Sequence, residues 1–220
     1  TITIDWAPGN AEYSWILEYS TDNVNWASEG TVTSAPYTIY GLYPGESYTI
    51  RLKSDCGNDE TSSWTVVSAA THCLAATLPF IEDFESAPGS GSGDMLPCWT
   101  RNTNHATIGY PYTSTTYHHS GHYAAYFHGS NAYYSYVATP RFDDAVQMDN
   151  LLISFYAYKS NAESKIEVGI MTDPDDYSTF VRIGPAVTPS STSSWEIVEV
   201  NTSSYTGDGK YVAFRIPAGA

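Results

Sequence analysis

The chain has 220 residues, enough for two domains of ordinary size, and its formal net charge is −15. Nine Lys and Arg residues stand against 24 Asp and Glu, which argues against a nucleic-acid partner because a phosphate backbone needs clustered cations. No apolar run is long enough to cross a bilayer, so membrane insertion is not expected. The nineteen tyrosines, with abundant Ser and Thr, favour pleated, half-buried surfaces and predict an all-β protein.

Three cysteines, Cys56, Cys73 and Cys98, allow one disulfide and leave one thiol over. A disulfide, few lysines and many Tyr, Ser and Thr residues are together more typical of an exported protein than of a cytosolic one. We therefore expect a secreted or cell-surface protein.

Short alternating runs separated by turns fill residues 1–73. "TITIDW" and "YSWILEYSTDNVNW" alternate apolar and polar residues as strands do, and "SSWTVVSAATHC" supplies a closing strand. "LYPGESY" places a Pro-Gly turn ahead of Tyr48, and Tyr48, Ile50 and Leu52 then alternate along the next strand. A tyrosine at such a corner returns its hydroxyl to nearby backbone in sandwich domains. The patterns predict a small β-sandwich.

Through Trp6, Leu42, Pro44, Gly45 and Tyr48, this segment resembles a fibronectin type III domain over essentially its whole length. Members of that family begin with a strand that carries an early proline. No such strand precedes "TITIDW", so the resemblance implies that the chain starts at the second strand of the domain. This first module is expected to act mainly as a spacer.

Similar domains in surface proteins of Bacteroidetes-type bacteria often carry a cysteine pair around the last hairpin, where Cys56 and Cys73 stand here. The resemblance therefore implies a disulfide between Cys56 and Cys73, which would contribute about 3 kcal/mol by closing a short loop. Cys98 would then be a free thiol, or would pair with chain elsewhere.

Residues 77–220 contain eight or nine short alternating runs with turn chemistry between them and no lasting helical period, which predicts a jelly-roll sandwich. The segment resembles the MAM-like jelly rolls of bacterial surface proteins, called choice-of-anchor or cleaved-adhesin modules. The resemblance is carried by "LPFIEDFES…LPCWT…HSGHYAAYF…ATPRFD…ISFYAY…VGIMTDPDDYSTFVRI…YTGDGKYVAFR". Such modules end with a further strand, so both sandwiches are expected to be truncated at the chain ends.

The stretch "FIEDFES" at residues 80–86 offers three interpretations. In a strand, Asp83 and Glu85 would share one face, at a spacing that an acid/base pair of a glycosidase could use. In related jelly rolls the corresponding glutamate, here Glu85, binds a structural calcium ion together with loop carbonyls, and Asp83 would be the weaker second ligand. The third interpretation is a solvated acidic face. We expect no hydrolytic activity, because no matched acid and base environments are visible.

Tyrosines cluster in "IGYPYTSTTYHH" and "NAYYSYV", on expected loops and strand ends. Exposed tyrosines give rigid, amphipathic contact area that suits sugar rings or protein partners. Half of them are core residues in the alternative interpretation, with Tyr134 buried and Tyr133 facing out. The predicted ligand-binding residues are Tyr110, Tyr112, Tyr117, Tyr133 and Tyr136.

These features predict non-catalytic adhesion or binding modules of a large secreted or cell-surface bacterial protein, which contact a glycan or a host or surface protein. Flanking modules of the same longer chain are expected. Two alternatives remain open at this stage. The pair could direct a secreted hydrolase to its substrate, or it could be a structural unit of a surface fibre.

Overall fold

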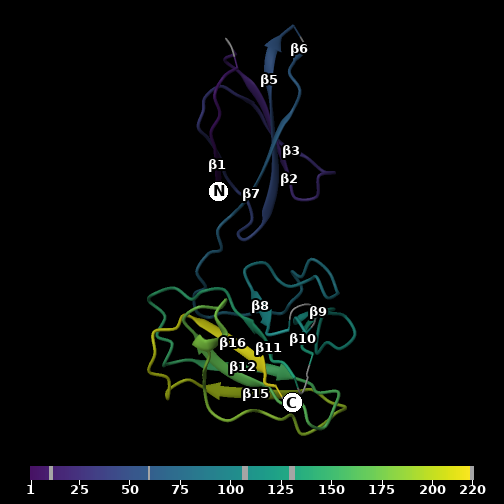
Figure 1. The fold of residues 1–220 in the computed structure, drawn as a ribbon, viewed down its shortest axis with the longest axis vertical. Coiled ribbons are helices and arrows are strands. Elements are labelled where there is room, and N and C mark those ends of the chain that lie inside the picture. The colour runs from purple at the N-terminus through teal and green to yellow at the C-terminus, as the bar shows by residue number, and fades with distance from the viewer. Residues whose placement is uncertain (10–11, 59, 106–108, 129–131, 219–220) are drawn as a thin grey trace. The chain divides into compact units, whose positions relative to one another are not determined.

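The computed structural model describes the whole chain except residues 10–11, 59, 106–108, 129–131 and 219–220. It divides into two compact units, Thr1–Leu74 (unit 1) and Ala75–Ala220 (unit 2). Both units are built from antiparallel strand pairs (Figure 1), which confirms the all-β class and the β-sandwich architecture. Within the described residues, no helix is both long enough and apolar enough to span a membrane.

Unit 1 is a sandwich of two sheets. The larger sheet has the order β3-β2-β5-β6, with β7 also paired to β5, and the smaller pairs β1 with β4. Its strands are β1 (Ile2–Ile4), β2 (Trp15–Ser20), β3 (Ala27–Val32), β4 (Tyr37–Ile39), β5 (Ser47–Gly57), β6 (Glu60–Thr61) and β7 (Thr65–Ala70).

The core of unit 1 follows the alternation seen in the sequence. Leu17 of β2, Ile39 of β4 and Ile50 of β5 are almost fully buried in one cluster, so residues from both sheets meet there. At the turn before β5, the hydroxyl of Tyr48 accepts a hydrogen bond from the backbone N–H of Tyr43 at 3.0 Å. This is the corner contact that the "LYPGESY" pattern predicts.

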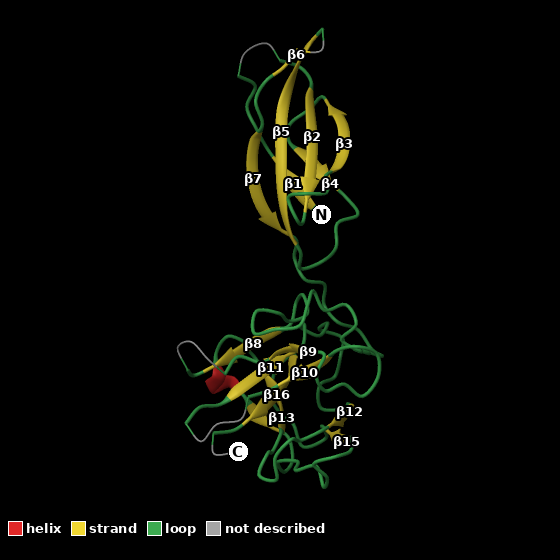
Figure 2. Cartoon of the chain, turned by 90° about the vertical axis from the view of Figure 1, so that its right-hand side faces the viewer, coloured by secondary structure: helices red, strands yellow, loops and turns green. Residues whose placement is uncertain are grey.

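Unit 2 holds a five-stranded sheet of order β14-β13-β16-β11-β8 and two further strand pairs, β12-β15 and β9-β10. Its strands are β8 (Thr100–Thr103), β9 (Tyr112–Ser114), β10 (Ala124–Tyr126), β11 (Ser135–Ala138), β12 (Leu152–Ala157), β13 (Glu167–Met171), β14 (Val181–Arg182), β15 (Glu196–Asn201) and β16 (Tyr211–Ile216). A short 3-10 helix, η1 (Tyr177–Thr179), is drawn in red in Figure 2.

Both faces of the five-stranded sheet are covered. On one face, β12 and β15 pack against it, and the rings of Phe155 and Phe214 meet edge to face at 5.1 Å. On the other face, the segment around η1 lies over Tyr136, Met171 and Ala213, each of which is fully buried. The central strands therefore bury residues of both alternation phases, as sheets covered on two sides do.

The covered outer face also contains an ion-pair network. The carboxylate of Glu167 on β13 accepts hydrogen bonds from Arg182 Nη1 at 3.0 Å and from Arg215 Nε at 2.8 Å. The Arg215 guanidinium also donates to the hydroxyl of Tyr177 at 2.7 Å and lies 3.9 Å from the ring centroid of Phe180. Glu167 and Arg215 are directly paired across β13 and β16, so the sheet register brings the two charges together.

The predicted Cys56–Cys73 disulfide is wrong. Cys73 and Cys98 are the disulfide-bonded cysteines, and Cys56 is an exposed free thiol. In the register of β5 with β7, Ser47 lies opposite Ala70, so Cys73 follows β7 near the start of β5, whereas Cys56 stands near its end. The strand from Ser47 to Cys56 spans about 30 Å, far beyond the separation of two Cα atoms that a disulfide allows.

We expect that alkylation of the unreduced protein modifies Cys56 alone, because its thiol is exposed and the other two cysteines are oxidised. Peptide mapping by mass spectrometry measures this, with Cys56→Ser as the control that takes up no label. Labelling at Cys98, with Cys56 protected, would contradict the structure and restore the original pairing.

Candidate functional site: an aromatic pocket in unit 2

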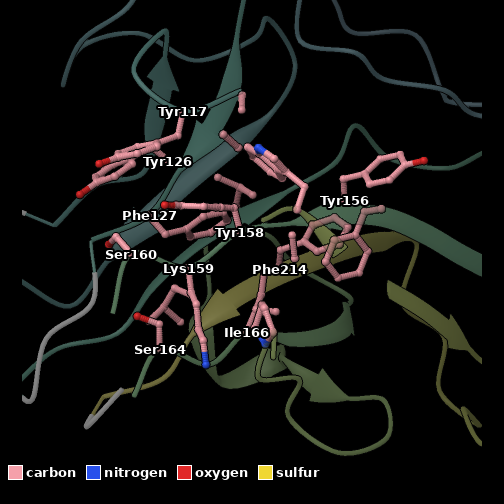
Figure 3. A pocket seen from close by; sticks show the side chains of 18 of the residues that line it. Tyr117, Tyr126, Phe127, Tyr156, Tyr158, Lys159, Ser160, Ser164, Ile166 and Phe214 are labelled. Atoms are coloured by element: carbon pink, nitrogen blue, oxygen red, sulfur yellow. The ribbon is translucent and has the colours of Figure 1, made fainter. Parts of the chain in front are cut away.

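A pocket of about 210 Å³ opens in unit 2 between the five-stranded sheet and the strands β10 and β12. Its floor is apolar and comes from the inner faces of the strands: Val137 of β11, Phe214 and Ile216 of β16, and Phe155 of β12. The strand β10 and the segment that follows β12 close its sides. Figure 3 shows the side chains that line it.

Aromatic rings form one part of the wall. Tyr117 stacks on Tyr158 with ring centroids 5.2 Å apart, and Trp195 lies 5.5 Å from Tyr158. Tyr156 stacks on His119 at 3.6 Å. Tyr117 and Tyr156 remain 44% and 50% exposed, so parts of these rings are open to a ligand from solvent.

The remaining wall is polar and cationic. Lys159, Ser160 and Ser164 line it, with Lys165 beside them. In Figure 3, Lys159 and Ser164 lie on the lower side of the view, opposite Tyr117 and Tyr126. None of the described lining residues is Asp or Glu. The pocket thus combines stacking surfaces with hydroxyl and ammonium donors.

Three of the five predicted ligand-binding tyrosines lie at or near a surface. Tyr117 lines the pocket, and half-buried Tyr112 on β9 packs at 5.0 Å on Tyr126, another lining residue. Tyr110 is exposed and lies 5.8 Å from the Arg101 guanidinium, away from the lining.

The predictions for Tyr133 and Tyr136 are wrong. Tyr133 is buried against the ring of His105, 5.4 Å away, while its neighbour Tyr134 is the more exposed of the two. Tyr136 is fully buried, its hydroxyl donates to the carbonyl of Pro174, and burial raises its pKa to about 12. For Tyr136, strand alternation does not separate a buried from an exposed face, because every residue of β11 is buried.

"FIEDFES" is not a strand but a turn. The side chain of Glu82 accepts the N–H of Phe84 at 2.8 Å, and Asp83 accepts the N–H of Glu85 at 3.0 Å. Phe84 has a φ of 65° and is half-buried against Trp99, with ring centroids 5.7 Å apart. Short-range bonds of this kind compete with strand pairing, so the two-face argument for Asp83 and Glu85 does not apply.

Glu85 does lie at the "HSG" turn. Its Oε1 accepts the backbone N–H groups of His122 and Tyr123 at 2.8 and 2.9 Å, and these bonds lower the pKa of the Glu85 carboxyl. A Cβ at Gly121, whose φ is 61°, would lie 2.4 Å from the same oxygen, so this approach requires glycine. The carboxylate thus tethers one loop to another.

The hydrogen bonds of Glu85 and Asp83 leave few free oxygens for the predicted calcium site. Calcium takes six to eight oxygens, whereas Glu85 Oε1 already accepts two N–H groups and Asp83 accepts one. In the described part of the chain, no group of three or more His, Cys, Asp or Glu side chains is placed to hold a metal ion. Calcium at Glu85 stays a prediction that melting can test.

We expect Glu85→Ala to lower the melting temperature equally in calcium and in chelator, because the lost contacts are to backbone N–H groups. Since the folded-state pKa of Glu85 is lowered, its contribution is present above the ordinary carboxyl pKa and disappears as the pH falls through the folded value. The difference between wild type and variant should therefore become smaller in acid. A deficit that appears only with calcium would make Glu85 a metal ligand.

Sequence reasoning missed Tyr156, Tyr158, Lys159 and Trp195. The stretch "FYAYKS" could have indicated the first three as binding residues, because it places aromatic residues and a lysine together at the end of a strand. Trp195 immediately precedes β15, which pairs with β12, so the two strands bring these rings together.

No family model matches the sequence, and no curated protein matches it. A solved structure from work on the promiscuous specificity of carbohydrate-binding modules of the β-sandwich superfamily aligns with a TM-score of 0.40 and 10% identity. The alignment covers 94% of this chain and 80% of that one. At a TM-score below 0.5, the similarity assigns no function.

Proposed function

We propose that unit 2 is a non-catalytic glycan-binding module, a MAM-like jelly roll, and that unit 1 is a fibronectin type III spacer. The observation that carries the proposal is the pocket wall made by the partly open rings of Tyr117, Tyr158 and Trp195, in which Tyr117 stacks on Tyr158 and Trp195 lies tilted beside it. The C–H faces of a sugar ring are apolar and pack on such rings, while donors beside them bind hydroxyl groups.

The pocket chemistry favours binding over glycoside hydrolysis. Glycosidases need two carboxyl groups about 5 to 9 Å apart across the substrate, whereas no Asp or Glu stands among the described lining residues. Asp83 and Glu85, the pair considered for this role, are engaged with turn backbone outside the lining. Adhesion through a bound glycan is therefore the activity that we assign to the module.

An extracellular setting supports the same proposal. The disulfide-bonded Cys73 and Cys98 favour an oxidising compartment, and the low lysine content fits export. The proposed location is the outer surface of a bacterium or its secretions, where glycans of a host or of other cells are available partners.

Affinity electrophoresis in gels that contain soluble polysaccharides tests the proposal. We expect at least one polysaccharide to retard the migration of the wild-type chain. The same polysaccharide should not retard Trp195→Ala, whose melting profile is checked to match that of wild type. Tyr13→Ala, an exposed tyrosine of unit 1, is the control and should migrate like wild type. Equal retardation of wild type and Trp195→Ala, or no retardation across neutral and acidic polysaccharides, would contradict the proposed function.

A further inference from the structure

Lys159 is a buried cation at the pocket. Its side chain lines the pocket although the residue is only 8% exposed, and its Nζ donates one hydrogen bond, to the carbonyl of Ala162 at 3.2 Å. An ammonium has three donors, and a buried charge is costly unless it is paired. Among the described residues, no carboxylate lies within ion-pair distance of Lys159.

The carboxylate that acts on Lys159 at longer range is Glu196, whose pKa the lysine helps to lower. That carboxylate is already bound by the backbone N–H of Ser190 at 2.8 Å and by the Ser190 hydroxyl. The Glu196 carboxylate is thus hydrogen-bonded to Ser190 and not to Lys159. The ammonium group of Lys159 therefore keeps N–H donors for a ligand.

The charge of the lining is opposite to that of the chain. The protein has four lysines in 220 residues and a net charge of −15, yet two of the four, Lys159 and Lys165, line this pocket. Chance placement would favour acidic residues, which outnumber the cations by 24 to nine, and the described lining has none. The charged side chains of the lining therefore favour a negative group.

The size of the pocket limits the ligand further. About 210 Å³ is less than the roughly 300 to 1,000 Å³ of drug-sized sites, so the pocket accommodates one ring and not a chain. A dense polyanion would also be repelled by the net charge of −15 that the chain carries. A single charged ring at the end of a glycan meets both conditions.

Building on the proposed function, we propose that the pocket binds a terminal acidic sugar, with its ring on Tyr117, Tyr158 and Trp195 and its carboxylate or sulfate group on Lys159. Ser160 and Ser164 line the same wall and supply hydroxyl groups for the remaining polar atoms of the ring. Lys165, which is exposed, adds positive charge beside the anion.

Isothermal titration with matched oligosaccharide pairs tests the proposal. The acidic probes end in glucuronic acid, in sialic acid or in a sulfated hexose. Each has a neutral partner, which is the methyl ester for the two carboxylates and the desulfated form for the sulfate. We expect at least one acid to bind tenfold or more tightly than its neutral partner, as a charge-assisted contact predicts. The pair that shows the preference identifies carboxylate or sulfate as the group.

Two variants locate the charge. Lys159→Met keeps the apolar stem and is expected to reduce binding of the acid to the level of its neutral partner, with neutral binding unchanged. Lys165→Gln, on the exposed side of the pocket, should reduce the preference for the acid over its neutral partner several-fold. This second variant keeps the proposal testable if Lys159→Met does not fold. A preference that both variants retain, or neutral sugars bound as tightly as acidic ones, overturns this proposal and leaves glycan binding intact. Binding of no probe from either set overturns both.

Discussion

Replacing Glu167 by alanine is expected to lower the free energy of unfolding of unit 2 by about 3 to 5 kcal/mol, which is the cost of leaving a buried charge without its partner. The Glu167 side chain is 8% exposed and binds Arg215, which is 14% exposed. Arg182, at 51% exposure, is screened by solvent and adds little. The expected loss therefore comes from Arg215 of β16, whose buried charge would lose its partner on β13.

Thermal or urea unfolding of the unit 2 transition measures the effect. Glu199→Ala is the matched control, because Glu199 stands exposed on β15 and should change stability by less than 1 kcal/mol. Arg182→Ala should fall between the two. A loss for Glu167→Ala no larger than that of the control would show that Arg215 is adequately solvated or held by Tyr177 and Phe180 alone.

The second large effect concerns the pocket. Tyr117→Ala and Trp195→Ala should each weaken glycan binding by about 30-fold or more, which corresponds to about 2 kcal/mol for a central aromatic contact. Tyr117 is 44% exposed on a loop, so its removal is expected to leave the fold intact. Trp195 supports Tyr158 at 5.5 Å, so its removal also frees that ring.

Tyr110→Ala separates the pocket from the tyrosine loop that sequence patterns favour. Tyr110 belongs to the same segment as Tyr117 but contacts Arg101 and does not line the pocket. Its replacement should leave the dissociation constant within twofold of wild type. Equal losses for Tyr110→Ala and Tyr117→Ala would move the binding surface from the pocket to the loop.

Much of the fold was predictable because local patterns and packing agree. Tyr48 and Ile50 alternate along one strand and are buried in the core, and the Pro-Gly turn before them leads to the Tyr43–Tyr48 bond. The apolar faces of a half-buried sheet give a period of two, which a sequence displays directly. The sandwich class followed from such runs.

The site was less predictable because non-local contacts form it. Both faces of β11 are covered, so alternation could not say that Tyr136 is buried. In "FIEDFES", side chains of Glu82 and Asp83 bind the backbone two residues on, which replaces the expected strand by a turn. The pocket joins β10, β12, β16 and the 158–166 segment, and no single stretch carries that pattern.

Aromatic carbon–proton NMR spectra of the folded chain, recorded while an oligosaccharide that binds is titrated in, test whether the pocket rings contact the glycan. We expect shifts that saturate at the rings of Tyr117, Tyr158 and Trp195, with the signals of Tyr110 and of the unit 1 tryptophans unchanged. Saturable binding that leaves the three pocket rings unperturbed and shifts Tyr110 instead would contradict this expectation.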